Sequence, residues 1–282
     1  MASGKTIRSA SPLVKLVGFP ATLLHGDTLV LDRWLWISSR VEGNRKNGVR
    51  VSQPRNGGLP AYGEAGLGKA VDIGCGAGAF TIGLARGGYS VLGLTWSPID
   101  CETAESRATI CRTPSARFEV QDVRQLDQRK DLIGGFDLAV CTEVVEHILN
   151  DKKLLIDVGR LLRPGGRLLL TTPFYGFRAI TSEDYGPYST VEDGGHVRRG
   201  YTVEQLEVLC RDAGLTLKSY TYCSGILSQK ITTLMRWISR ASPLLAWAVT
   251  LPLRPFPLVF DRWLTPLLNW PCFSICIEAE KP

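Results

Sequence analysis

Short apolar runs alternate with amphipathic stretches along the chain from residue 69 onward. An apolar run bounded by turn residues predicts a strand, and apolar positions spaced three and four apart predict a helix. Strands are predicted at 69–73, 90–95, 116–120, 136–141 and 167–172, with helices at 78–87, 98–110 and 150–162 between them. This alternation is typical of an α/β fold with a parallel sheet and crossover helices. A helix near 202–213 and strands near 215–223 and 273–279 complete the pattern.

The segments around this core differ from it in composition. Residues 1–43 are predicted to be helical in parts. Residues 43–68 hold many Gly and Pro and few large apolar side chains, so this segment is predicted to be a mobile loop. The pattern therefore divides the chain into four parts. They are an N-terminal helical cap with a mobile loop (1–68), a core (69–225), an insertion (226–271) and the last strand (272–282).

The insertion at 226–271 is apolar and basic. It holds four of the seven tryptophans, and its five basic residues against one acid place +4 of the chain's net +6 here. Ile231, Leu234, Met235 and Ile238 fall on one helical face. Three interpretations stay open: a helical cap on the sheet, a lid over an apolar substrate, or peripheral contact with a membrane surface, which a basic, Trp-rich amphipathic helix suits.

Composition narrows the class of protein. At 282 residues and 44% hydrophobic, the chain can bury one sizeable core. Its eight cysteines form no CxxC pair, and Pro12, Lys15 and Pro20 interrupt the N-terminal apolar stretch, so we expect a cytoplasmic protein with reduced thiols. The net charge of +6 is mild and does not indicate a DNA partner. Oligomeric state leaves no trace in the sequence.

The segment Val71 to Phe80 carries the clearest chemical signal. An acid, Asp72, and three alternate glycines, Gly74, Gly76 and Gly78, follow the apolar run of the first predicted strand. Glycines let the backbone turn sharply and approach a ligand, and open α/β sheets bind ligands at the carboxyl ends of their strands. The segment predicts a nucleotide-cofactor loop. A nicotinamide cofactor fits poorly, because GxGxxG would place the third glycine one residue later and an acid about twenty residues on.

Two further motifs follow at suitable spacing. Thr142-Glu143-Val144-Val145-Glu146-His147 comes after the apolar strand 136–141, and Leu162-Arg163-Pro164-Gly165-Gly166 precedes the fifth strand. With the glycine segment, they resemble the class I S-adenosylmethionine-dependent methyltransferases, and in particular the O-methyltransferases of ubiquinone biosynthesis. The resemblance covers roughly residues 69–223. It implies a Rossmann-like, mostly parallel sheet of seven strands whose last strand, 273–279, runs antiparallel.

The resemblance also implies S-adenosylmethionine as the cofactor. The positions expected to contact it are Asp72, Gly74, Cys75, Gly76, Gly78, Thr95, Trp96, Asp122, Val123 and Thr142. One position departs from the family, which places an acid at the end of the second strand for the ribose hydroxyls. Here that strand ends on Thr95 and Trp96, where a hydroxyl can still bond the ribose and an indole can stack on the adenine.

The Glu-His segment suggests candidates for catalysis. On a helical turn, Glu143, Glu146 and His147 would share one face, and His196 lies in the loop expected to return to the same edge of the sheet. The resemblance extends to metal-assisted O-methyltransferases, which implies a Mg²⁺ site of Glu143, Glu146, His147 and His196. The alternatives are an acid or base role for His147 or His196, and a purely structural role for the set.

These observations predict an O-methyltransferase that acts on a small hydrophobic or lipid-linked hydroxyl. We expect His147 or His196 to be the base, and Phe174, Tyr175, Tyr185 and the insertion to frame the acceptor pocket. Two alternatives remain. An RNA 2′-O-methyltransferase would need a basic groove beside the cofactor, and a non-catalytic cofactor-binding protein would be consistent with the missing acid at Thr95.

Overall fold

The computed structural model describes residues 12–24, 26–46 and 66–282. Seven strands form one sheet in the order β3-β2-β1-β4-β5-β7-β6. The strands are β1 (Lys69–Ile73), β2 (Ser90–Thr95), β3 (Ala116–Val120), β4 (Phe136–Thr142), β5 (Leu162–Pro173), β6 (Thr216–Cys223) and β7 (Ser274–Glu280). The five strands β3-β2-β1-β4-β5 pair in parallel with their neighbours, and β7 pairs antiparallel with both β5 and β6. The expected seven-stranded sheet with an antiparallel last strand is therefore confirmed.

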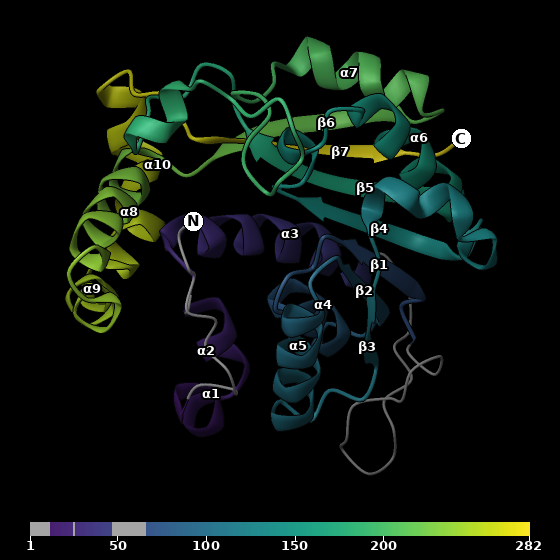
Figure 1. The fold of residues 1–282 in the computed structure, drawn as a ribbon, viewed down its shortest axis with the longest axis horizontal. Helices are drawn as coiled ribbons and strands as arrows, with labels where there is room; N and C mark the ends of the chain where they lie inside the picture. Colours follow the sequence, from purple (N-terminus) through teal and green to yellow (C-terminus); the bar gives the residue numbers. More distant parts are fainter. Residues whose placement is uncertain (1–11, 25, 47–65) are drawn as a thin grey trace.

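Helices cover both faces of this sheet (Figure 1). Those of the core are α4 (Ala79–Arg86), α5 (Pro98–Ile110), α6 (Asp151–Leu161) and α7 (Val203–Asp212), and those of the N-terminal cap are α1 (Pro12–Val17), α2 (Phe19–Leu24) and α3 (Thr28–Lys46). Short 3₁₀ helices lie between them: η1 (Val123–Gln128), η2 (Lys130–Leu132), η3 (Val145–His147) and η4 (Ser182–Tyr185). The mobile loop predicted at 43–68 falls mostly on residues 47–65, outside the described residues.

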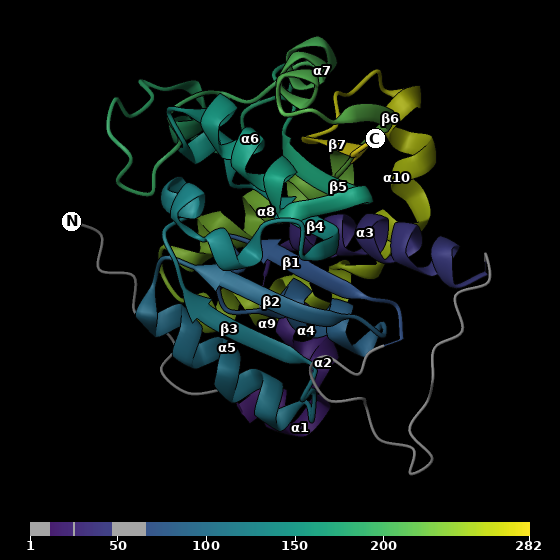
Figure 2. The same cartoon turned by 90° about the vertical axis from the view of Figure 1, so that its right-hand side faces the viewer.

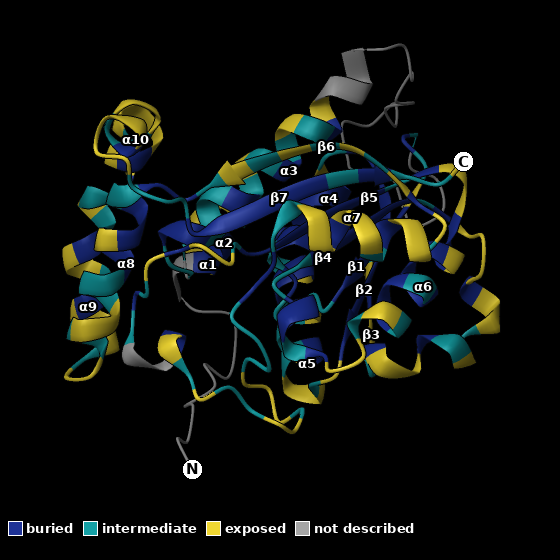
Figure 3. Ribbon diagram, turned by 90° about the horizontal axis from the view of Figure 1, so that it is seen from above, coloured by how far each residue is buried: buried dark blue, intermediate teal, exposed yellow. Residues whose placement is uncertain are grey.

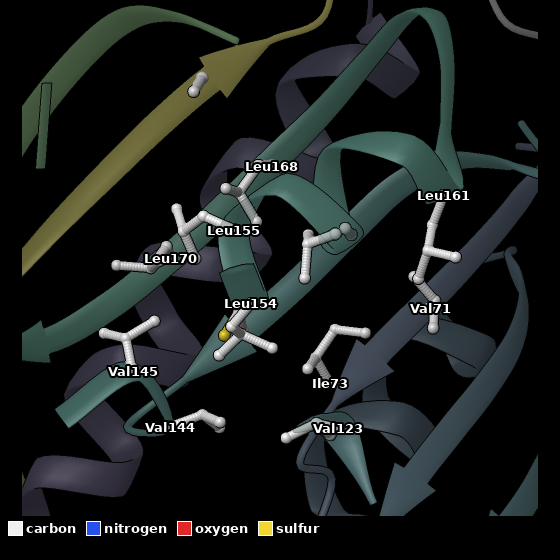
Figure 4. Close-up of a cluster of buried hydrophobic side chains, with 14 of the residues drawn as sticks. Val71, Ile73, Val123, Val144, Val145, Leu154, Leu155, Leu161, Leu168 and Leu170 are labelled. Carbon is white, nitrogen blue, oxygen red and sulfur yellow. The ribbon is translucent and has the colours of Figure 1, made fainter. Parts of the chain in front are cut away.

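The strands alternate their side chains between two apolar layers, as the period of two in a strand requires. Val71 and Ile73 point to the layer covered by α6 and α7, where they meet Leu154 and Leu155 (Figure 4). Ala70 points to the opposite layer, which α2, α3 and α4 cover. In Figure 2 the strands from β5 to β3 lie one below another, with α6 and α7 above them and α2 below. The central strands are thus buried on both faces, and their carboxyl ends are held rigidly.

Local sequence explains where two of these helices begin. Ser97 accepts a hydrogen bond from the Asp100 N–H (3.2 Å) and Pro98 follows it, so α5 starts with a side-chain cap and a proline in its first turn. Thr202 and Gln205 form a reciprocal capping box at the start of α7. The strand β5 begins earlier than the predicted 167, because Leu162 already pairs with Phe136 before a register shift.

Between β6 and β7 the chain forms α8 (Ile226–Ser239), α9 (Pro243–Thr250), the 3₁₀ helix η5 (Leu251–Leu253) and α10 (Pro255–Leu267). The helix α8 packs against α3, α9 and α10. The helices α8, α9 and α10 lie together at the end of the molecule beyond the sheet (Figures 1 and 3). Within the described residues, no single helix has the length and apolarity to cross a bilayer. The pair 243–253 and 255–267, bent by 63°, meets that criterion only when both arms are counted together.

Candidate active site

A cavity of about 250 Å³ lies at the carboxyl ends of β1, β2 and β4. The strand order reverses between β1 and β4, which is where open α/β sheets bind ligands. Six of the residues expected to contact the cofactor line this cavity: Gly74, Gly76, Thr95, Trp96, Asp122 and Val123. The donor cavity, as we call it, therefore lies where the glycine segment predicted it.

The glycine loop after β1 needs its glycines for two different reasons. Gly76 has φ +49°, and a Cβ on it would meet no atom within 4 Å, so its bare backbone faces open space on the cavity wall. Gly78 has φ +78°, and a Cβ there would lie 2.7 Å from both Ala104 and Phe118. Gly76 thus leaves room for a ligand, whereas Gly78 lets α4 pack closely against its neighbours.

Four expected contact residues lie off the wall of the donor cavity: Asp72, Cys75, Gly78 and Thr142. Asp72 is buried beneath the loop and accepts a hydrogen bond from Thr81 Oγ1 (2.7 Å). Burial raises the pKa of Asp72 to about 6. Its other oxygen, Oδ1, is buried and has no hydrogen-bond partner among the described residues, so it can still accept a bond from a ligand or a bound water.

An acid that the sequence analysis missed stands at the far end of the donor cavity. β2 ends on Thr95 as expected, but the carboxylate of Asp100, one turn into α5, also lines the cavity beside Trp96. Asp122, in contrast, is already paired, because the Arg124 guanidinium donates hydrogen bonds of 2.6–3.0 Å to both of its carboxylate oxygens. Asp100 therefore supplies an acid to the donor cavity near the end of β2, where the sequence analysis found none, and its position after Ser97-Pro98 was the available signal.

Glu143 follows β4 in a left-handed conformation, with φ +53°. This conformation is uncommon for a residue with a Cβ, and such strain concentrates at functional sites. It turns the side chain toward α3, where Arg33 Nη2 lies 2.8 Å from Glu143 Oε2. Arg33 is buried, bonds Ser274 Oγ through Nε and Nη2, and was not predicted. Glu143 is therefore not on one helical face with Glu146 and His147, which corrects that expectation.

Glu146, in η3, is fully buried. Burial raises its pKa well above the ordinary value, and the nearby Glu143 acts in the same direction. Thr172 Oγ1 donates to its Oε2 (3.1 Å), while Oε1 is buried without a hydrogen-bond partner among the described residues. This unsatisfied oxygen points to the neighbouring histidine, since His147 Nε2 lies 3.9 Å away.

The two candidate histidines meet edge to face, with ring centroids 4.6 Å apart. His147 Nδ1 lies 3.0 Å from the carbonyl oxygen of Gly195, which only accepts, so in the neutral ring Nδ1 carries the proton and Nε2 the lone pair. Burial, and then the neighbouring His147, lower the pKa of His196 to about 4. His147 is therefore the better-oriented proton acceptor of the two.

Three of the four expected metal ligands come together. One ligand atom from each of Glu146, His147 and His196 lies within 4.8 Å of the others. Glu143 is held away by Arg33. The remaining set of one carboxylate and two imidazoles suits a transition metal rather than Mg²⁺, which prefers oxygen ligands. The residues present therefore do not fit the expected Mg²⁺ site.

A second cavity of about 560 Å³ adjoins the first, and we call it the acceptor cavity. Glu143, His147 and Gly194 line both cavities. The remaining wall comes mainly from α3, the 181–196 loop and Phe273, and the insertion contributes Arg236. Phe174, Tyr175 and Tyr185, which were expected to line the acceptor pocket, are not on this wall. Phe174 packs on Tyr222, and the side chains of Tyr175 and Tyr185 are exposed.

Two arginines hold the 174–200 loop over these cavities. Arg198 pairs with Asp151 and donates to the carbonyl oxygens of Ile148 and Leu149. Arg199 donates to the carbonyl oxygens of Tyr175 and Phe177. The Val197 N–H also bonds the Glu146 carbonyl oxygen (2.9 Å), so the loop that carries His196 is tied to the turn that carries His147.

Comparison with known proteins agrees with this geometry. Residues 48–220 match the model of a family described as a methyltransferase domain. The mitochondrial ubiquinone biosynthesis O-methyltransferase of Bos taurus is 28% identical over 211 residues, which cover 72% of this chain and 54% of the relative. The enzyme of the same name from Pseudomonas paraeruginosa is 30% identical over 166 residues, 55% of this chain and 68% of the relative. The chain spans about half the length of the mitochondrial relatives it matches.

Solved structures share the fold at low identity. Magnesium protoporphyrin IX methyltransferase from Synechocystis PCC 6803, with bound S-adenosylmethionine, aligns with a TM-score of 0.52 at 16% identity and covers 96% of this chain and 94% of its own. The [4+2]-cyclase SpnF aligns with a TM-score of 0.51 at 19% identity, covering 80% and 77%. The fold alone therefore does not fix the reaction, and the acceptor must be argued from the site.

Proposed function

Because this chain belongs to the methyltransferase domain family of class I S-adenosylmethionine-dependent enzymes, we propose that it methylates a hydroxyl oxygen on a small hydrophobic or lipid-linked acceptor. The acceptor class that fits best is a hydroxylated aromatic ring with an apolar chain. Two relatives named as ubiquinone biosynthesis O-methyltransferases support this choice. The cytoplasmic location stays a prediction.

The observation that carries the proposal is the shared wall between the two cavities. Methyl transfer is an in-line displacement, so the acceptor atom must approach the methyl carbon from the side opposite the sulfur. Two adjoining cavities that meet at Glu143, His147 and Gly194 support such an approach. The acceptor cavity, at about 560 Å³, has the size of a small-molecule site.

The donor cavity fits S-adenosylmethionine, whose sulfonium supplies an activated methyl group. The open space over Gly76 admits the ligand against bare backbone. Asp100 is placed to accept hydrogen bonds from ribose hydroxyls, and Trp96 offers a face for the adenine. These assignments restore the ribose recognition that Thr95 alone left weak.

His147 is the proposed general base. As the new O–C bond forms and the C–S bond breaks, the hydroxyl proton passes to His147 Nε2, and the sulfur leaves as a neutral thioether. The Gly195 carbonyl oxygen fixes the ring for this role from the Nδ1 side. Arg33 takes part by holding Glu143 at the wall between donor and acceptor, so we assign it a positioning role.

A nucleic-acid acceptor is disfavoured by the charges at the site. The two arginines that line the acceptor cavity are both paired, Arg33 with Glu143 and Arg236 with Asp27. A phosphate backbone needs unpaired cations along its path.

The experiment uses a tritiated methyl donor with two matched probes, an alkyl catechol and the corresponding alkyl aniline. We expect label on the catechol oxygen only. We expect His147→Gln to lower the rate by about 10² to 10⁴, the usual contribution of a general base, and His196→Gln to lower it less. Label on the nitrogen probe alone would contradict the choice of oxygen. Failure of the protein to bind S-adenosylhomocysteine in calorimetry would remove the whole proposal.

Metal dependence is tested separately. Because the donor set is a poor match for Mg²⁺, we expect that Mg²⁺ added to EDTA-treated protein will not raise the rate of methyl transfer. Loss of activity with EDTA and full recovery with Mg²⁺ would contradict this expectation and show that the enzyme uses Mg²⁺.

A further inference from the structure

The helix α10 carries a row of aromatic rings on its outer side. Phe256, Phe260 and Trp263 follow each other at i, i+4 and i+7, and their neighbouring ring centroids are 6.2 and 6.4 Å apart. All three side chains are exposed, and Leu267 extends the row at 77% exposure. The opposite side of α10, with Pro257 and Thr265, is buried. The described residues therefore leave this row uncovered, although its composition is that of a protein core (Figure 3).

The helix α9 exposes a second apolar surface in the same insertion, on the other side of α8 (Figure 3). Its exposed residues include Leu244, Leu245 and Val249, and the whole helix has no charged residue. Both α9 and α10 pack on α8, and the two arms meet at 63°. Neither arm reaches the length of about 20 residues that a spanning helix needs.

The charges around this surface all have one sign. Arg240 and Arg262 are exposed at its border, and the Arg262 guanidinium lies 3.9 Å from the centroid of the Trp263 ring. The only acid of the insertion, Asp261, faces inward and accepts hydrogen bonds from the N–H groups of Leu227 (2.7 Å) and Ser228 (3.0 Å) at the start of α8. The outer surface therefore offers solvent apolar side chains and positive charge.

We propose that the outer surface of α9 and α10 docks this protein onto a bilayer that contains anionic lipids. Short amphipathic arms with aromatic residues lie in the plane of the headgroup boundary, where the rings enter the apolar layer and arginines contact phosphates. A second copy of the chain suits this surface less well. A symmetric dimer would bring Arg240 and Arg262 of both copies together without an acid to balance them.

The insertion that carries the docking surface also contributes to the acceptor cavity. Arg236 of α8 lines that cavity, and the next residue, Trp237, is exposed at 68% on the side of the insertion. We therefore expect a lipid-linked acceptor to enter the cavity from the side of the insertion. This part of the inference rests on the proposed function, whereas the docking itself does not.

Flotation with two kinds of vesicle tests the docking. We expect the wild-type protein to rise with vesicles of phosphatidylcholine containing 30% phosphatidylglycerol, and to rise less with phosphatidylcholine alone. Trp263→Ser with Leu267→Ser should weaken binding about tenfold or more, given the apolar area withdrawn from the lipid. Arg240→Gln with Arg262→Gln should weaken binding to anionic vesicles about 30-fold, since each surface arginine contributes a factor of about five.

Matched controls change an exposed aromatic and aliphatic pair and an exposed arginine pair elsewhere on the protein. Tyr220→Ser with Val208→Ser removes exposed apolar side chains from β6 and α7, and Arg112→Gln with Arg211→Gln removes two exposed charges. Both controls should float like the wild type. Calorimetry with S-adenosylhomocysteine on the same samples shows that each variant is folded and keeps its donor site.

Two outcomes overturn the proposal. One is wild-type protein that binds S-adenosylhomocysteine but stays at the bottom of the gradient with anionic vesicles, which leaves the proposed function intact. The other is a concentration-dependent dimer in sedimentation velocity that Trp263→Ser with Leu267→Ser dissociates, because the surface would then be covered by a second copy.

Discussion

Replacement of Arg33 by methionine tests whether the buried ion pair with Glu143 holds the site together. Arg33 Nη2 lies 2.8 Å from Glu143 Oε2, and both side chains are largely buried. Removing one partner of a buried pair leaves the other charge uncompensated, at a cost of about 3 to 5 kcal/mol in unfolding free energy. Methionine keeps most of the side-chain volume, so packing contributes little to this loss.

The loss should depend on pH in a definite direction. Burial already raises the pKa of Glu143, and Arg33 opposes that effect, so Arg33→Met raises this pKa further. A carboxyl group with a raised pKa in the folded state stabilises the fold at low pH, and this contribution disappears as the pH rises through the folded pKa. The deficit of Arg33→Met relative to the wild type should therefore be larger at pH 8 than at pH 5.

Urea unfolding at the two pH values gives the measurement. Arg40→Met is the matched control, because Arg40 also lies on α3 and pairs with an acid, Glu278 (3.4 Å), but is 36% exposed and should cost less than about 1 kcal/mol. The double variant Arg33→Met with Glu143→Gln should recover about 1 to 3 kcal/mol as coupling energy. The reasoning fails if Arg33→Met at pH 8 costs no more than Arg40→Met.

Three other predictions concern the donor side. Asp100→Asn should weaken S-adenosylhomocysteine binding roughly tenfold in calorimetry, since a charged hydrogen-bond acceptor is lost, whereas the exposed Glu102→Gln on the same helix should have no effect. Gly78→Ala should lower stability by about 1 to 3 kcal/mol more than Gly134→Ala, because both have positive φ but only Gly78 has close neighbours; equal melting temperatures would contradict this. Burial raises the pKa of Asp72 from 3.8 to about 6. The contribution of this group to the free energy of unfolding is therefore present below pH 4 and disappears as the pH rises through 6. In denaturant titrations, Asp72→Asn should remove about 3 kcal/mol of this pH dependence.

The strands of the core could be predicted because their apolar runs are buried on both faces and end at turn residues. Strand β1 was expected at 69–73 and β2 at 90–95, and the structure has both at these residues. The start of β5 was missed, because Leu162 pairs with β4 ahead of a bulge, and the Pro164-Gly165-Gly166 run that follows it is typical of a turn.

The site could be predicted only in part, because its remaining contacts cross the chain. Arg33 meets Glu143 from a helix 110 positions earlier, and no local pattern relates the two. The positive φ of Glu143 is also invisible, since the left-handed region is predicted from glycine rather than from a glutamate. Because of these two features, Glu143 is an ion-pair partner in the structure, whereas the sequence had suggested a metal ligand.

The origin of the two cavity walls has a consequence for how this protein could diversify. The donor wall comes from strand ends and from the turns that follow them, which the sheet fixes in place. The acceptor wall is drawn mostly from α3 and the 181–196 loop, which lie outside the strands of the sheet. New acceptors could therefore be recruited by changing only the residues of these segments that face the acceptor cavity, while the strand ends and turns that line the donor cavity pass unchanged from one variant to the next.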